Sequence, residues 1–225
     1  MSLLLRIPFA LVFWVFTAGL VLASIDHFQS IRLASLWLLG LGAGFYLLFV
    51  LILSFFKRSM HFAHTFCHEL NHAFFSVLFL KKIKAFQAHA EKGGQVSFEG
   101  KNNLMITLAP YSVPLFALFT VLLKLLAEPR VFPAIHFVVG FFISFHLHSV
   151  FSEFRLYQSD LRVYGFFLSL AFVVFINTLF LLWIVSVVAG DFSAGFTLLK
   201  NGVFSLRDVV AFLIEKGSLI VNTQK

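Results

Sequence analysis

The sequence predicts an all-α polytopic membrane protein with about six transmembrane helices and a short β-hairpin after the third of them. Of its 225 residues 60% are hydrophobic and 12% are charged, whereas soluble domains carry roughly 25% charged residues. Apolar runs of about 18 residues or more recur, and each can cross a hydrocarbon core about 30 Å thick. The net charge of +7 does not indicate a nucleic-acid partner, because Lys and Arg lie in short clusters between apolar runs, as at membrane flanks.

The apolar runs predict six spans and three regions of the chain. Residues 1–56 form two N-terminal spans, residues 57–190 the core, and residues 191–225 an interfacial helix with a tail. The first run could also be a secretory signal, but Arg6 is its single basic residue, and we expect a retained span. The expected spans are Leu3–Ala23, Leu33–Phe56, His61–Leu80, Leu104–Leu126, Phe132–Val150 and Val163–Val188.

Two polar segments have patterns of their own. Within Lys81–Lys101, the stretches 84–90 and 95–99 flank Glu91-Lys92-Gly93-Gly94, a turn signal that predicts a β-hairpin. After the last run, Ser205 and Asp208 resemble a capping box, and apolar residues follow at helical spacing. We expect an interfacial helix over Ser205–Lys216. Orientation stays open, because Lys57-Arg58 and Lys81-Lys82 flank opposite ends of the third run.

The motif with the clearest chemical meaning is His68-Glu69-Leu70-Asn71-His72. In the H-E-x-x-H pattern, two histidines one helical turn apart point the same way and can share a metal ion. With 9 His and 6 Glu in 225 residues, the pattern arises by chance roughly 0.01 times per chain. Ionisable groups within a span are costly and usually mark function. A zinc ion bound by His68 and His72 would offset that cost.

A catalytic zinc ion needs a third protein ligand, and spacing leaves the choice open. His61 and His64 share the helix face of the motif, and we expect them to line a wet vestibule. Cys67 is the single cysteine, so an intrachain disulfide is excluded. We expect its side chain to point to the other side of the helix. The downstream candidates are His89, Glu91, Glu99, His136, His146, His148, Glu153 and Asp160.

The motif within a hydrophobic run, followed by a hairpin and by Asp160 about ninety residues later, resembles the site-2 protease family of intramembrane zinc metalloproteases, most of all its small bacterial branch. The stretch Ala109–Pro114 is similar to the proline-bearing stretch of that family. By resemblance, His68, His72 and Asp160 bind zinc, and Glu69 is the general base for a zinc-activated water. The family pattern of asparagine and proline before an aspartate–glycine pair is missing around Asp160, so no oxyanion donor is identified.

The resemblance implies cleavage of membrane-spanning protein substrates in the cell (inner) membrane of a bacterium, with a regulatory membrane partner possible. The alternatives are a non-proteolytic zinc-binding membrane protein, either a transporter or an inactive protease-like scaffold, and a purely structural or scaffolding membrane protein in which the motif is accidental. For Asp160 the alternative is a helix-capping role. Residues 84–99 could hold a substrate by strand addition. For Pro110 and Pro114 we expect a kink in their helix, with a substrate or active-site role as the alternative. We expect Asn177 to form hydrogen bonds between helices rather than to be a ligand.

Overall fold

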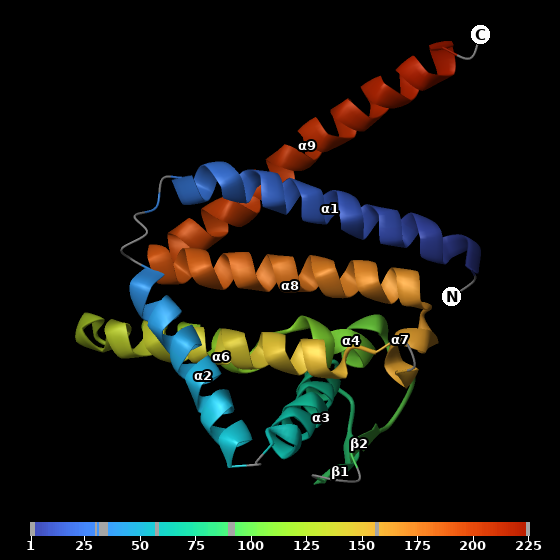
Figure 1. Ribbon diagram of the computed structural model, residues 1–225. Coiled ribbons are helices and arrows are strands. Elements are labelled where there is room, and N and C mark those ends of the chain that lie inside the picture. The colour runs from blue at the N-terminus through green and yellow to red at the C-terminus, as the bar shows by residue number, and fades with distance from the viewer. Residues whose placement is uncertain are drawn as a thin grey trace.

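The computed structural model describes residues 3–29, 31, 36–56, 59–89, 93–155 and 158–223, and it is mostly helical with one β-hairpin (Figure 1). The predicted turn residues Glu91 and Lys92, and the basic pair Lys57-Arg58, lie outside these ranges. The elements are α1 (Leu3–Gln29), α2 (Trp37–Phe55), α3 (His61–Leu78), β1 (Ile83–His89), β2 (Gly93–Phe98), α4 (Leu104–Ser112), α5 (Leu115–Leu122), α6 (Phe132–Glu153), α7 (Ser159–Val163), α8 (Phe166–Ala189) and α9 (Phe192–Thr223), with 3₁₀ turns at Leu123–Leu125 and Pro129–Val131.

Among the described residues, four helices are long and apolar enough to cross a membrane: α1, α2, α8 and the segment Pro129–Glu153 that contains α6. The bent pair α4 and α5 makes a fifth if it counts as one span. These helices indicate an integral membrane protein. The predicted count of six also included α3, which is not among them, because its histidines, Glu69 and Asn71 give it a polar face.

The hairpin follows α3, as predicted. β1 and β2 are antiparallel, with Phe86 opposite Val96 and His89 opposite Gly93. In Figure 1, α1, α8 and α6 run roughly parallel, while α3 and the hairpin lie at the lower edge of the molecule. A buried apolar cluster joins α3, α4, α7 and α8 directly behind the motif helix, with Phe75, Ile106 and Leu161 among its members. This cluster fixes α4 and α7 relative to α3.

The α4–α5 segment is broken by its prolines. Pro114 cannot donate a backbone hydrogen bond, and the axes of the two helices differ by 80°. The break leaves the carbonyl of Tyr111 outside the regular helical pattern, and the Asn177 side chain of α8 donates to it at 2.7 Å. The expected kink and the expected interhelical role of Asn177 are both confirmed.

The C-terminal helix begins well before the predicted start at Ser205, which lies inside α9. The Asp191 side chain accepts hydrogen bonds from the backbone N–H of Ala194 and the hydroxyl of Ser193, so Asp191 caps the helix. The first part of α9 packs on α1, where a Cβ added to Gly19 would lie 3.0 Å from the carbonyl oxygen of Gly202. The apparent capping box at Ser205 therefore does not start a helix.

Helices α2 and α6 cross at two glycines that allow the backbones to touch. A Cβ added to Gly42 would lie 1.8 Å from the carbonyl oxygen of Phe137, and one added to Gly140 would lie 2.0 Å from that of Leu39. Such close approach is the usual role of small residues between membrane helices. Gly44 lies two residues after Gly42 in α2, and a Cβ added to it would have nothing within 4 Å.

We expect Gly42→Ala to destabilise the protein, because the obstructing atoms belong to the backbone of α6 and cannot rotate away. Overpacking costs about 1–3 kcal/mol, and thermal unfolding in detergent measures it. Gly44→Ala is the matched control and should leave the unfolding temperature unchanged or slightly higher, because Ala is the better helix former. Equal unfolding temperatures for both variants would contradict the described crossing.

Candidate metal centre

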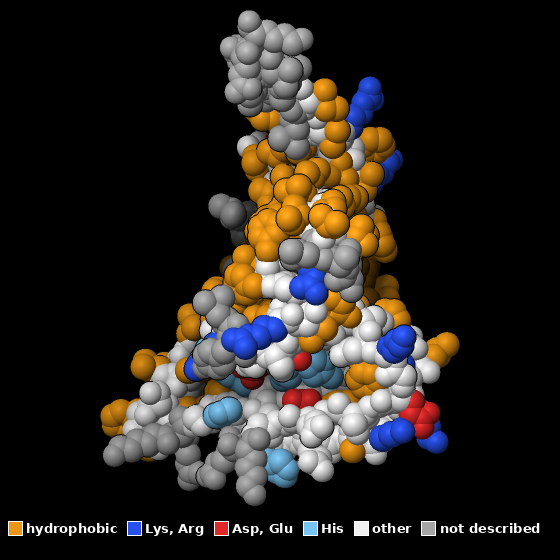
Figure 2. Space-filling model, turned by 90° about the vertical axis from the view of Figure 1, so that its right-hand side faces the viewer, with side chains coloured by type: hydrophobic (Ala, Val, Ile, Leu, Met, Phe, Trp, Pro, Cys, Tyr) orange, Lys and Arg blue, Asp and Glu red, His pale blue; other side chains and the backbone are white. Residues whose placement is uncertain are grey.

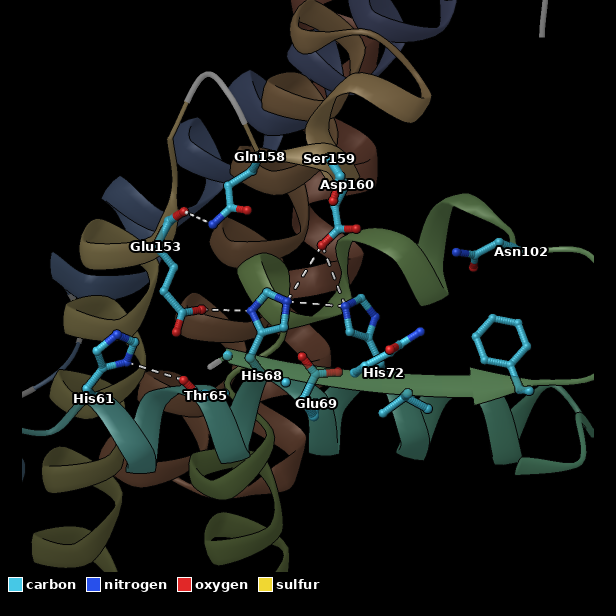
Figure 3. Close-up of a pocket in the computed structure, with 15 residues that line it drawn as sticks. His61, Thr65, His68, Glu69, His72, Asn102, Glu153, Gln158, Ser159 and Asp160 are labelled. Atoms are coloured by element: carbon cyan, nitrogen blue, oxygen red, sulfur yellow. Dashed lines mark hydrogen bonds and ion pairs between the residues drawn. The ribbon is translucent and has the colours of Figure 1, made fainter. Parts of the chain in front are cut away.

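The two motif histidines point from α3 to the same place (Figure 3). Because residues four apart lie one turn from each other on a helix, their rings meet, and the Nε2 atoms of His68 and His72 are 3.2 Å apart. Both side chains are largely buried, with 13% and 14% of their surface exposed. This confirms the geometry that the motif spacing predicts.

Asp160 reaches the histidines from α7. Its Oδ2 atom lies 3.6 Å from Nε2 of His68 and 3.6 Å from Nε2 of His72, and the buried Tyr111 hydroxyl donates to the same oxygen at 3.4 Å. Asp160 does not cap α7, whose N-cap is Gln158 and has no side-chain capping bond. The structure thus brings together the three residues that the resemblance implies, as a group that could hold a metal ion.

The three ligand atoms lie close enough together to share one metal ion. Their triangle has sides of 3.2, 3.6 and 3.6 Å, and the point equidistant from all three in its plane lies about 2.0 Å from each, within the Zn–N and Zn–O range of about 2.0–2.2 Å. A metal ion at this point would have three protein ligands.

The charge of Asp160 also suits a metal ligand. Burial alone would raise the pKa of its carboxyl, but the facing imidazoles of His68 and His72 outweigh burial and hold that pKa below its ordinary value. The carboxyl is therefore ionised at neutral pH, and only the ionised form is a good ligand.

The Nδ1 atom of His72 is held by a backbone carbonyl that a proline makes available. Pro110 has no N–H, so the carbonyl of Ile106, four residues earlier in α4, loses the helical donor that it would otherwise have. The Nδ1–H of His72 donates to this oxygen at 2.8 Å. Pro110 therefore contributes to the site as well as to the bend. The only indication in the sequence that the Ile106 carbonyl would be free to accept this hydrogen bond was the proline four residues later.

The remaining candidate ligands lie elsewhere. Glu153 contacts the opposite edge of the His68 ring, with Oε2 at 2.7 Å from Nδ1. Nε2 of His146 is bonded to Asn177, and Nδ1 of His148 is bonded to Tyr46. Three others do not belong to the group: His89 is exposed, Glu99 pairs with Lys84, and His136 lies in the first half of α6. Glu91 lies outside the described residues.

Glu69 lies beside the three-atom group and is 7% exposed. It lines a cavity of about 470 Å³ together with His68, His72, Asp160 and the start of β2. Figure 2 shows histidine and acidic side chains inside a hollow at this end of the molecule. The cavity therefore lies next to the metal group, with the Glu69 carboxylate at its wall.

Gly94 of β2 packs directly on Glu69. A Cβ added at this position would lie 2.4 Å from Cγ and 2.7 Å from Oε1 of Glu69, closer than atoms can approach. The glycine therefore allows the strand to lie against the carboxylate. Sequence analysis assigned the glycine pair to a turn and missed this contact, since no local pattern relates Gly94 to Glu69.

We expect Gly94→Ala to displace Glu69 or β2 and so to lower any hydrolytic activity of the site. A displacement of about 1 Å can cost 10²-fold in rate, while zinc content should stay unchanged because no ligand atom is touched. Gly40→Ala is the control, since its added Cβ meets nothing within 4 Å. Parental activity in Gly94→Ala would show that β2 does not constrain the carboxylate.

A second cavity, of about 510 Å³, adjoins the first. His61, Glu153 and Gln158 line both cavities, and His64 and His148 line the second. His64 is buried, its Nδ1 lies 3.3 Å from the Ser152 hydroxyl, and its ring packs edge-on against His148. His61 and His64 thus lie along a polar recess next to the site, in agreement with the predicted vestibule.

Glu153 and the Ile106 carbonyl are the contacts that sequence reasoning did not assign. Glu153 was one of eight equivalent candidates, because it lies far from His68 in the sequence and no local pattern relates the two residues.

Comparison of the chain with models of known protein families, with curated proteins and with solved structures found no match.

Proposed function

We propose that this chain is an intramembrane zinc metalloprotease that hydrolyses peptide bonds of membrane-spanning proteins. The observation that carries the proposal is the meeting of His68, His72 and Asp160 at distances that suit one zinc ion, with Glu69 beside them at the wall of a cavity. The H-E-x-x-H motif has this purpose in zinc proteases: two ligands and one general base on a single helix.

The hydrogen bonds around the group support a cation at its centre. The Ile106 carbonyl only accepts, so the proton of a neutral His72 is on Nδ1 and its Nε2 carries a lone pair. That lone pair faces Nε2 of His68 and the carboxylate of Asp160. A divalent cation at the centre of these three atoms would be bound by all of them at once.

Zinc bound here would act as a Lewis acid and lower the pKa of a coordinated water toward about 7. Glu69 would take the proton from that water and later give it to the leaving amine. His68, His72 and Asp160 would keep the reacting atoms in place. The residues present fit this chemistry, and the oxyanion donor stays unassigned.

The substrate would bind along β2. Within the described residues, the sheet has only β1 and β2, so β2 keeps one unpaired edge, and Gly93, Gly94, Gln95 and Val96 line the cavity. A peptide must leave its own helical hydrogen bonds before its carbonyl can reach the zinc, and its freed groups then need partners. Strand addition to β2 would supply them.

The exposed apolar surfaces of the long helices suit a bilayer, and we place α3 within it beside them, although α3 is more polar than α1, α2, α6 and α8. The resemblance to site-2 proteases favours the cell (inner) membrane of a bacterium and a regulatory membrane partner. A metal transporter is less consistent with the structure, because the one metal group found among the described residues sits beside a buried glutamate.

Removal of the metal tests the function. The purified protein should contain about one zinc ion, and it should cleave a single-span substrate in detergent or vesicles. A chelator should abolish cleavage, and added zinc should restore it. Zinc uptake into sealed vesicles without any proteolysis would favour a transporter, and protein without zinc would favour a scaffold.

A further inference from the structure

Glu153 is the last residue of α6, and its carboxylate forms the shortest contact that His68 makes, at 2.7 Å from Nδ1. It is not a member of the three-atom group, because that group uses Nε2, on the far edge of the same ring. The side chain is largely buried, with 20% of its surface exposed. A largely buried carboxylate against a histidine of the metal group requires an explanation.

The contact can do two things for a metal ligand. An ionised carboxylate only accepts hydrogen bonds, so it selects the form of His68 that has its proton on Nδ1 and its lone pair on Nε2. It also resists rotation of the ring. Carboxylates and carbonyls commonly hold zinc-ligating histidines in this way, and His72 already has such a partner in the Ile106 carbonyl.

The connection between α6 and α7 strengthens this arrangement. The Gln158 side chain donates to the backbone carbonyl of Glu153 at 3.2 Å. This hydrogen bond links the last residue of α6 to the residue that precedes α7. Glu153 and Asp160, seven residues apart, therefore approach His68 from opposite ring edges (Figure 3). One short segment supplies both the third ligand atom and the contact that orients the first ligand.

We propose that Glu153 is a positioning residue of the metal site, which holds the ring and the tautomer of His68 and does not bind the metal itself. The proposal rests on the proposed zinc site. It accounts for a largely buried carboxylate that the hydrolytic mechanism does not use.

The test is zinc affinity, measured by competition with a chromophoric chelator on the full chain in detergent. Glu153→Ala should weaken zinc binding about 10- to 100-fold, the usual effect of losing such a partner. Glu153→Gln keeps the shape and an acceptor oxygen, so its affinity should lie between parent and Glu153→Ala. Glu128→Gln is the matched control, because Glu128 is exposed and pairs with Arg130 before α6, and it should bind zinc as the parent does.

The possible outcomes separate the two proposals. Parental zinc affinity in Glu153→Ala would overturn the positioning role and leave the zinc site standing. A loss as large as that of His68→Ala would make Glu153 a ligand and would also overturn it. If the parent itself binds no zinc, the proposed function fails first. Should Glu153→Ala not fold, as judged by its unfolding temperature, parental affinity in Glu153→Gln would count against the role.

Discussion

Glu69→Gln is expected to lower peptide cleavage by about 10²–10⁴-fold, the usual contribution of a general base, and to leave zinc content unchanged. Gln has the size of Glu, so it fits under Gly94 of β2 without a new clash. It cannot take a proton from water near neutral pH. The measurement is the initial rate of cleavage of a single-span substrate, together with the zinc content of the same preparation.

The matched control is Glu99→Gln, which makes the same chemical change at an exposed position of the hairpin. It should cleave at the parental rate. Parental activity in Glu69→Gln would remove the assigned base and, with it, the present mechanism. Loss of zinc from that variant would instead indicate that Glu69 has a role in metal binding.

Asp160→Asn is expected to weaken zinc binding by more than the 10- to 100-fold that loss of an outer contact costs, because it removes the only charged atom of the three-atom group. Cleavage should be lost at ordinary zinc concentrations and recover in part when zinc is added in excess. An amide oxygen is a poorer zinc ligand than a carboxylate, while the side-chain shape stays the same.

This variant also separates the metal role from helix capping. Asn caps helices as well as Asp does, so a capping residue would tolerate the change. Asp191→Asn is the control, because Asp191 does cap α9, and it should retain zinc, stability and activity. If both variants bind zinc like the parent, Asp160 is not a ligand.

The motif helix was predictable because its chemistry is local. Four residues make one helical turn, so the spacing of His68 and His72 already brings their rings together, and the pattern arises too rarely by chance to be ignored. The hairpin was predictable for the same reason, since Gly93 and Gly94 follow two charged residues between short β-prone stretches.

The rest of the site depends on contacts between segments far apart in the chain. Spacing alone could not choose Asp160 over Glu153, and the resemblance to a protease family supported that choice. In the structure the two acids contact different edges of one ring. That distinction arises from how α6 and α7 pack against α3, which no local pattern describes.

Two predictions differ from the structure for simple physical reasons. A hydrophobic run was enough to count α3 among the apolar spans, but its four histidines, Glu69 and Asn71 make it more polar than α1, α2, α6 and α8. The pair Ser205 and Asp208 looked like a helix start, but the cap is Asp191, whose carboxylate is the first to reach free backbone N–H groups after the turn at Gly190.

The most direct test of the account is the position of zinc, located by anomalous scattering from crystals of the zinc-loaded protein. We expect one strong peak between α3 and α7, about 2.0–2.2 Å from Nε2 of His68, Nε2 of His72 and the carboxylate of Asp160. Zinc bound elsewhere, or no peak between these three side chains at full zinc loading, would contradict it.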